Sequence, residues 1–161
     1  MQSAGALTST ELAAWAGLLS AHRRLVLVLD AELELATGLS LSDYDVLLQL
    51  AHAPEGRLRM SDLAEAVLLT RSGLTRLVDR LQERGLVERV RCPGDGRGLN
   101  AVLTDTGRER LQEAAPHHLA GVRRHFLDRL DPADVERLAV VWRSLADDED
   151  DDPVSCDAPR A

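Results

Sequence analysis

The feature that most constrains the fold is an amphipathic helix that runs directly into a glycine-rich hairpin. Apolar residues recur at helical spacing and predict this helix over Arg71–Arg84. The side chains expected to face inward are Leu74, Leu77, Val78 and Leu81. We expect Thr70 to cap the helix, because a threonine hydroxyl can accept a hydrogen bond from a first-turn N–H that lacks an intrahelical partner. Gly85 is expected to end it.

A hairpin follows this helix, and a shorter helix precedes it. Two β-prone runs, Val87–Arg91 and Leu99–Leu103, are separated by the glycine-rich turn Pro93–Gly98, and this composition favours a tight connection. Ser61–Ala66 predicts the shorter helix, with Ser61 as its cap. Helix, turn, helix and hairpin in this order indicate a winged helix-turn-helix, which is a nucleic-acid-binding module.

The N-terminal region predicts a long helix outside this module. Thr8 and Glu11 have the spacing of a capping box, so we expect a loose tail over residues 1–10 and a helix over residues 11–38. Its apolar stripe is formed by Leu12, Trp15, Leu19, His22, Val26, Leu29, Leu33 and Ala36. A long helix that is apolar along one side requires a partner surface. The usual partner is a second copy of the chain.

The remaining segments also predict helices. Ser42–Asp45 is expected to cap the helix after Gly38. The inward side chains of that helix are expected to be Tyr44, Leu47, Leu48 and Ala51. Thr104–Gly107 opens another helical pattern, in which Pro116 predicts a kink or a break because an interior proline costs about 3 kcal/mol. Asp131–Asp134 starts the last helix, with proline at its first position. The predicted fold class is mainly α with a small β-hairpin wing.

The charge distribution permits DNA binding despite a net charge of −8. Residues 57–110 contain 11 arginines and 8 acidic residues, a net charge of +3, whereas residues 147–161 have a net charge of −6. The local sign matters more than the total for phosphate binding. The tail over residues 147–161, which begins with the acidic run Asp147–Asp152, is expected to be disordered. It either solubilises the protein or competes with DNA for the arginines.

Cysteine content and hydropathy bear on the location of the protein. Cys92 and Cys156 are too few for a disulfide framework and favour a reducing compartment. No signal peptide is evident, and no uncharged apolar run is long enough to span a bilayer. We therefore expect a cytoplasmic protein without membrane contact. No nucleophile–base pair, phosphate loop or pair of carboxylates stands out, so an enzyme is not predicted.

From about Glu11 to Leu145 the chain resembles the MarR-type family of bacterial transcription regulators. The segments that carry the resemblance are Leu41–Leu47, Leu63–Ala64, Thr70–Leu81, Gly85–Arg89, Asp95–Arg97 and Leu103–Gly107. The resemblance implies a single unit over residues 11–146, in which residues 11–38 and 105–146 interleave as dimerisation helices of a homodimer. Residues 41–103 would form the DNA-binding lobe. It also implies a small-molecule or redox effector that acts near the junction of the dimer and DNA lobes.

The resemblance also implies which residues contact DNA. In this family the second helix of the motif enters the major groove, and the matching residues are Arg71, Ser72, Thr75, Arg76 and Arg80. Arginine can form two hydrogen bonds to guanine, whereas Arg80, near the far end, can instead contact a phosphate or another part of the protein. Arg97 matches the wing arginine that enters the minor groove, and Asp95 matches the acid that orients it. Gly98 stands where a second arginine is common, which would weaken the contact. The alternative is that these arginines only solvate an exposed face.

A candidate effector pocket combines polar-tipped side chains on mainly apolar faces, namely Trp15, His22, Tyr44 and Asp45. It could bind a small aromatic or anionic effector. Alternatively, Trp15 and Tyr44 belong to the core and His22 belongs to the dimer interface. A redox role for Cys92 is weaker still, because peroxide sensors of the family carry their cysteine in the N-terminal helix region.

A metal site is not predicted, and neither is a cofactor. His117, His118 and His125 cluster near Glu113. His118 and His125 are seven residues apart, however, which is too far for one ion on one helix, and no closely spaced Cys or His pair supplies further ligands.

The sequence therefore predicts a homodimeric transcription regulator, a repressor that binds a pseudo-palindromic DNA site and is released by a small molecule. The rival prediction is a winged-helix module that binds proteins and not DNA. Salt dependence separates the two, because DNA binding weakens steeply with salt through counterion release, and an apolar protein interface need not.

Overall fold

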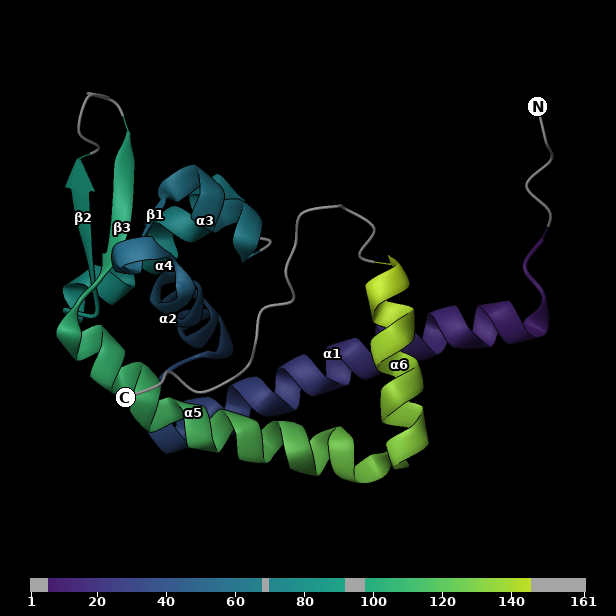
Figure 1. The fold of residues 1–161 in the computed structure, drawn as a ribbon. Coiled ribbons are helices and arrows are strands. Elements are labelled where there is room, and N and C mark those ends of the chain that lie inside the picture. The colour runs from purple at the N-terminus through teal and green to yellow at the C-terminus, as the bar shows by residue number, and fades with distance from the viewer. Residues whose placement is uncertain (1–5, 68–69, 92–97, 146–161) are drawn as a thin grey trace, which may run out of the picture.

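The computed structural model describes residues 6–67, 70–91 and 98–145, except for the side chain of Arg71. Its helices and strands lie in a winged lobe and in a frame of long helices (Figure 1). The helices are α1 (Ser9–Thr37), α2 (Leu41–His52), α3 (Met60–Ala66), α4 (Arg71–Glu83), α5 (Asp105–His125) and α6 (Pro132–Leu145). The strands are β1 (Arg57–Arg59), β2 (Val87–Arg91) and β3 (Leu99–Leu103), and the short 3-10 helices are η1 (Pro54–Gly56) and η2 (Leu127–Arg129).

The lobe contains a small antiparallel sheet with the strand order β1-β3-β2. The hairpin of β2 and β3 pairs Val87 with Leu103 at one end and Arg91 with Leu99 at the other, which confirms both predicted strands. β1 adds a third strand, in which Leu58 pairs with Ala101. The sequence analysis did not predict β1, because three residues are too short to show a strand pattern.

The core of the lobe is aliphatic and draws side chains from the end of α1 and the turn after it, from α2, α3, α4 and the sheet, and from the first half of α5. Its largest fully buried residues are Leu33, Leu39, Leu47, Leu50, Leu63, Leu74, Leu81, Leu111, Val46, Val78 and Val87. The four inward residues predicted for α4 are all buried. α2 was predicted less well. Tyr44 and Leu47 are buried as expected, but Val46 and Leu50 complete the face while Leu48 and Ala51 are only partly buried.

Hydroxyl caps start three of these helices. The caps of Thr8 and Thr70 were predicted, whereas Thr104–Gly107 was predicted only to open its helix. The Thr8 capping box begins α1; the hydroxyl oxygens of Thr70 and Thr104 accept the N–H groups of Gly73 at 3.2 Å and Gly107 at 2.9 Å. Residues 9 and 10, expected in the loose tail, already belong to α1. Gly38 ends α1 in the left-handed conformation, with φ of 70°.

Two predicted serine caps are wrong. α2 is capped by Ser40 and not by Ser42. The Ser40 hydroxyl accepts the N–H of Asp43, and the Asp43 carboxylate accepts the N–H of Ser40. This reciprocal pair uses an aspartate where a capping box usually has glutamate or glutamine. Ser61 does not cap α3, which begins one residue earlier; its hydroxyl donates to the Asp62 carboxylate at 2.8 Å.

The start of α5 is in direct contact with the turn between α4 and β2. The Thr104 hydroxyl donates to the carbonyl oxygen of Gly85 at 2.7 Å. A Cβ added to Gly107 would lie 2.1 Å from the carbonyl oxygen of Leu86, so only glycine fits at this approach. Of the kink or break predicted at Pro116, the break is wrong, because α5 continues through this residue. Pro116 is exposed, so water can satisfy the carbonyl that the proline leaves without its intrahelical donor.

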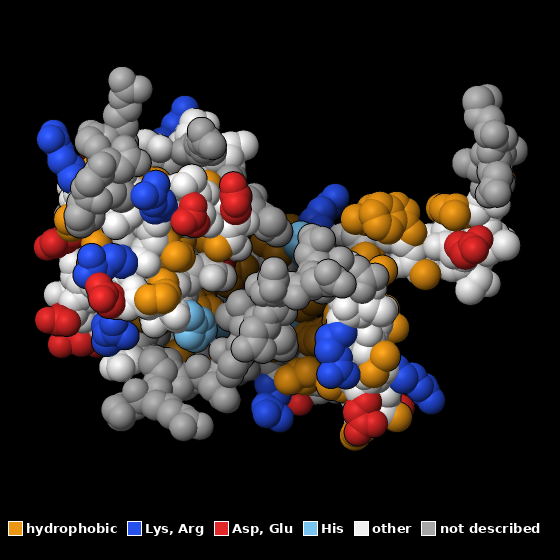
Figure 2. Space-filling model, turned by 45° about the horizontal axis from the view of Figure 1, so that its top comes forward, with side chains coloured by type: hydrophobic (Ala, Val, Ile, Leu, Met, Phe, Trp, Pro, Cys, Tyr) orange, Lys and Arg blue, Asp and Glu red, His pale blue; other side chains and the backbone are white. Residues whose placement is uncertain are grey.

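The frame consists of α1, α5 and α6. α1 and α5 lie side by side and antiparallel, and α6 leaves the end of α5 at a steep angle (Figure 1). Leu33 is the buried residue of α1, and none is buried in α6. Hydrophobic side chains gather instead on the exposed surface of α1 and α6 (Figure 2). The large ones are Leu12, Trp15, Leu18, Leu19, Val26, Leu27, Val140, Val141, Trp142 and Leu145.

α1 is long and apolar enough to span a membrane by length and composition alone, within the residues described. This qualifies the expectation from the sequence, which considered uncharged runs only. Arg23 and Arg24 lie near the middle of the helix, where charged groups in a bilayer are costly. Helices whose apolar side is covered by protein pass the same test, so length and composition do not decide what covers α1.

Candidate nucleic-acid interface

The candidate interface is built on α4, the second helix of the helix-turn-helix. Its apolar stripe is anchored in the core, and the rest of the helix is turned outward. Ser72, Thr75 and Arg76 are exposed on this outer side. Arg71 begins the helix, but its side chain lies outside the described part of the structure. Among the described residues, no ion pair occupies the guanidinium of Arg76, which leaves it available to a DNA base or phosphate.

The other end of α4 is held by an acidic residue of α2. Arg80 donates to one carboxylate oxygen of Asp43 at 2.7 Å, and Arg84 donates to the other at 3.2 Å. The Asp43 side chain is only 4 % exposed. Arg80 therefore has the intramolecular partner that the sequence left open, although half of its side chain is still exposed.

The wing is also tied to α4. Arg89, on β2, forms an ion pair with Asp79 and donates to the carbonyl oxygen of Thr75 at 2.9 Å. The side chain of Arg89 thus joins strand β2 of the hairpin to the exposed side of α4. Asp95, Arg97 and Cys92 lie outside the described residues, so the predicted wing contact stays a prediction.

The four candidate effector residues do not come together within one chain. Tyr44 is buried, and its ring packs on His118 of α5 with centroids 4.6 Å apart. Asp45 is half-buried, whereas Trp15 and His22 are exposed on α1. Trp15 lies 18 residues before the buried end of α1 at Leu33, which is about 27 Å along the helix axis.

Burial shifts the pKa values of two ionisable groups, one on α2 and one on α5. Burial raises the pKa of the Asp45 carboxyl, an effect that a hydrogen bond with Gln49 opposes. Burial lowers the pKa of His118, and its Nδ1 atom is buried without a hydrogen-bond partner in the described residues. The sequence analysis did not predict that His118 contacts Tyr44. The signal was its position at helical spacing between the apolar residues Ala115 and Val122.

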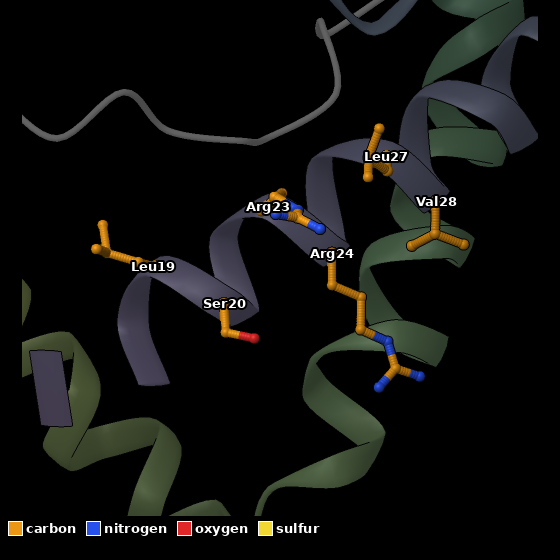
Figure 3. A pocket seen from close by; sticks show the side chains of 6 residues that line it. All are labelled: Leu19, Ser20, Arg23, Arg24, Leu27 and Val28. Atoms are coloured by element: carbon orange, nitrogen blue, oxygen red, sulfur yellow. The ribbon is translucent and has the colours of Figure 1, made fainter. Parts of the chain in front are cut away.

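The described surface also has two hollows on the frame. One, of about 690 Å³, is lined by residues of α1 alone: Leu19, Ser20, Arg23, Arg24, Leu27 and Val28 (Figure 3). A single helix cannot enclose a ligand, so this hollow belongs to the uncovered face of α1. The other, of about 400 Å³, lies between α1 and the end of α5, and its charged lining residues include Arg24 and Arg129.

The predicted histidine cluster is divided. His125 lies 2.8 Å from a carboxylate oxygen of Glu32 on α1, and Arg124 donates to the same oxygen at 3.1 Å. The hydrogen bond with His125 is the main cause that lowers the pKa of Glu32. In the described ranges, no three His, Cys, Asp or Glu residues are grouped as metal ligands would be.

These features define a winged helix-turn-helix protein of the class that regulates transcription. Comparison with known proteins gives the family. The model of the MarR family matches residues 37–98. The chain resembles AbsC, a MarR family transcriptional regulator from Streptomyces coelicolor, with 41% identity over 88% of this chain and 95% of AbsC and a TM-score of 0.79. The chain belongs to the MarR family of transcriptional regulators.

Two further relatives agree with this assignment. Sco3205, a MarR family regulator from Streptomyces coelicolor whose structure was solved in complex with DNA, is 38% identical over 91% of both chains, with a TM-score of 0.83. YdgJ, an uncharacterized HTH-type transcriptional regulator of Bacillus subtilis, is 37% identical over 87 residues. That match covers 54% of this chain and 52% of YdgJ; the chain thus spans about half the length of the curated relatives it matches.

Proposed function

We propose that the protein is a homodimeric repressor that binds a pseudo-palindromic site on double-stranded DNA and is released by a small-molecule effector. The observation that carries the proposal is the outward side of α4, where Ser72, Thr75 and Arg76 are exposed beside a fully anchored apolar stripe. In this role Arg76 pairs with a base edge, and the hydroxyls bind phosphates or bases. Arg71 joins them in the major groove.

Arg97 is the proposed minor-groove contact, oriented by Asp95. The narrow minor groove concentrates negative potential, which favours an arginine carried on a thin hairpin. Support comes from the described strands of the wing, which pair in register from Val87 to Arg91 and are tied to α4 through Arg89. Arg80 contributes to binding through Asp43 and through its exposed half.

A second copy of the chain is the proposed partner of the frame. Trp15 on α1 and Trp142 on α6 are 56% and 41% exposed, and α6 has no buried residue. Monomeric proteins rarely expose so extended an apolar surface. A dyad through residues 11–38 and 105–146 would cover these side chains and set two α4 helices about one turn of DNA, roughly 10 bp, apart.

Repression and release complete the proposal. A dimer on both half-sites occludes the DNA that it covers, and the cytoplasm, where a bacterial chromosome lies, is the proposed place of action. The effector is a small aromatic or anionic molecule. Tyr44 and Asp45 form the lobe side of its proposed site, and Trp15 and His22 form the α1 side. Because the two sides are far apart in one chain, they can meet only between two copies.

Selection of binding sites from random double-stranded DNA tests the function. We expect a two-fold symmetric sequence with half-sites about 10 bp apart. For about six phosphate contacts, the affinity for this site should fall by about 10³-fold between 50 and 200 mM salt. Failure to enrich any sequence, together with affinity that salt leaves unchanged, would instead favour the protein-binding module.

A screen of small aromatic acids tests the effector. The expected result is a compound that raises the melting temperature and weakens operator binding. Operator DNA should weaken binding of the compound by the same factor, because coupling between two ligands is reciprocal. A compound that still acts on a variant with Tyr44→Ala and Asp45→Ala would contradict the proposed pocket.

A further inference from the structure

Asp43 is a buried carboxylate at the point where α1, α2 and α4 meet. Its Oδ2 atom accepts the backbone N–H of Ser40 at 3.1 Å and Nη1 of Arg84 at 3.2 Å, and its Oδ1 atom accepts Nη2 of Arg80 at 2.7 Å. A buried carboxylate is tolerated only where partners compensate for the water that it loses. Of the three partners, Arg80 lies on the proposed DNA-reading helix and Arg84 is the residue that caps its C-terminal end.

The same two arginines connect α4 to the turn between α1 and α2. Besides its contact with Asp43, Arg84 donates through Nη2 to the carbonyl oxygen of Gly38 at 3.0 Å. We call residues 37–43 the elbow. It is held to α1 by the N–H of Leu41, which donates to Asp30 at 2.7 Å, and to α5 by Arg110, which donates to the carbonyl oxygen of Thr37. The elbow therefore joins the frame to α4.

The apolar contacts between α2 and α4 do not provide this connection. Val46, Leu47 and Leu50 on α2 and Leu77, Val78 and Leu81 on α4 are buried in one core. These contacts set which face of α4 is buried, but hydrophobic contact is non-directional, so it fixes the exact rotation of α4 less sharply than a hydrogen bond does. Hydrogen bonds from two guanidinium groups to the two oxygens of one fixed carboxylate do favour one rotation.

We propose that Asp43 is a positioning residue for DNA recognition. With Arg80 and Arg84 it fixes the orientation of α4 relative to the elbow and transmits to α4 any movement of the frame. The inference rests on the proposed function for its DNA readout, and it gives Arg80 and Arg84 a role through Asp43. A second acidic contact of α4, Asp79 with Arg89, lies within the lobe and does not reach the elbow.

Variants of Asp43 separate orientation from stability. Asp43→Asn keeps the shape and an acceptor for the N–H of Ser40 but removes the charge, whereas Asp43→Glu keeps the charge at a position where capping boxes accept glutamate. The matched control is Asp134→Asn, which removes the exposed pair of Asp134 and Arg137 on α6. Each variant is measured for melting temperature and for affinity toward both the selected operator and an unrelated duplex.

We expect Asp43→Asn to lower the ratio of operator to unrelated affinity by about tenfold, a typical coupling between sites. Affinity for the unrelated duplex should be unchanged or higher, because a negative charge has been removed. Asp43→Glu should restore most of the ratio, and Asp134→Asn should leave it unchanged. A purely structural role predicts that both affinities fall together with the melting temperature, and that result would overturn the proposal, as would an unchanged ratio.

A DNA-free measurement distinguishes this inference from the proposed function. Spin labels are placed at Ser72→Cys on α4 and Glu34→Cys on α1, in full-length protein with Cys92→Ser and Cys156→Ser, diluted with unlabelled protein. Asp43→Asn should broaden or shift the distance distribution, and Asp134→Asn should not. An unchanged distribution overturns the positioning role. A shifted distribution in a protein that binds no DNA would overturn the proposed function and leave the positioning role standing.

Discussion

The winged lobe and the helical frame contain similar apolar residues, but the lobe buries them and much of the frame exposes them. In the lobe, leucines and valines of α2, α3, α4 and the sheet are buried against one another. In the frame, the leucines of the first half of α1 and Val140 and Val141 of α6 are exposed. The contrast teaches that amphipathic spacing alone predicts a buried face but not which chain covers it. The lobe is completed by its own chain, whereas the partner that we propose for the frame is a second copy.

The largest expected effect is on the stability of the lobe. Leu47→Ala should lower the free energy of unfolding by about 3 kcal/mol, because it leaves a cavity in a closed core. Leu27→Ala, on the frame, should have little effect in protein dilute enough to be monomeric, since Leu27 is 63% exposed. Urea titrations of both variants at that concentration provide the comparison, and equal losses would break the distinction between lobe and frame.

Association through the frame should depend on protein concentration. Trp142→Ala is expected to weaken dimerisation by about 2 kcal/mol, roughly thirtyfold, because buried tryptophans dominate interfaces of this kind. Sedimentation velocity over a range of concentrations measures the change. Arg137→Ala, which truncates a largely exposed side chain of the same helix, serves as the control. A Trp142→Ala protein that associates like wild type would show that α6 is covered by something other than a second copy.

Within the lobe, α4 and the wing should recognise different features of the DNA. Arg76→Ala is expected to lose about 1–3 kcal/mol of discrimination at one base pair of each half-site. Arg97→Ala should weaken binding to all sequences and leave base preference unchanged, since a minor-groove arginine reads mainly shape and potential. Binding to a panel of single-base operator variants measures both, and identical profiles would contradict these assignments.

The smallest expected effect is a pH dependence at the junction of lobe and frame. Burial lowers the pKa of His118 below its usual 6.5, so the unfolded state binds a proton more readily than the folded state. Stability is therefore full above about pH 6.5 and falls as the pH drops from there toward the lower folded-state pKa. Urea midpoints from pH 8 to 5 should show a shallower fall for His118→Gln; parallel curves would contradict this origin.

Local signals predicted much of this structure. The spacing of Leu74, Leu77, Val78 and Leu81, the hydroxyl of Thr70 and the turn composition after Gly85 gave α4 and both wing strands, because each depends on neighbours in sequence. The cap of α2 was missed because Ser40 and Ser42 are both plausible starts, and only the packing of α2 selects between them. β1 was missed because it exists through pairing with β3, more than forty residues later.

The candidate site was predictable only in part, for a related reason. Exposure of Ser72, Thr75 and Arg76 follows from helical periodicity once the buried face is known. The ion pairs of Asp43 with Arg80 and Arg84 join residues about forty positions apart, and no local pattern indicates that an aspartate at a helix start is buried. The separation of Trp15 from Tyr44 likewise depends on how far α1 projects beyond the lobe.

The contact of Gly107 with the carbonyl oxygen of Leu86 has a mechanical consequence. It leaves no room for a side chain where α5 leaves the lobe, so the start of α5 is held tightly against the turn that follows α4. α5 is 21 residues long, about 31 Å at the rise of an α-helix. If α5 and the lobe rotate together by about 5°, the far end of α5 moves by about 3 Å. A helix held in this way would act as a lever, so that a small displacement near α6 would become a small rotation of the lobe.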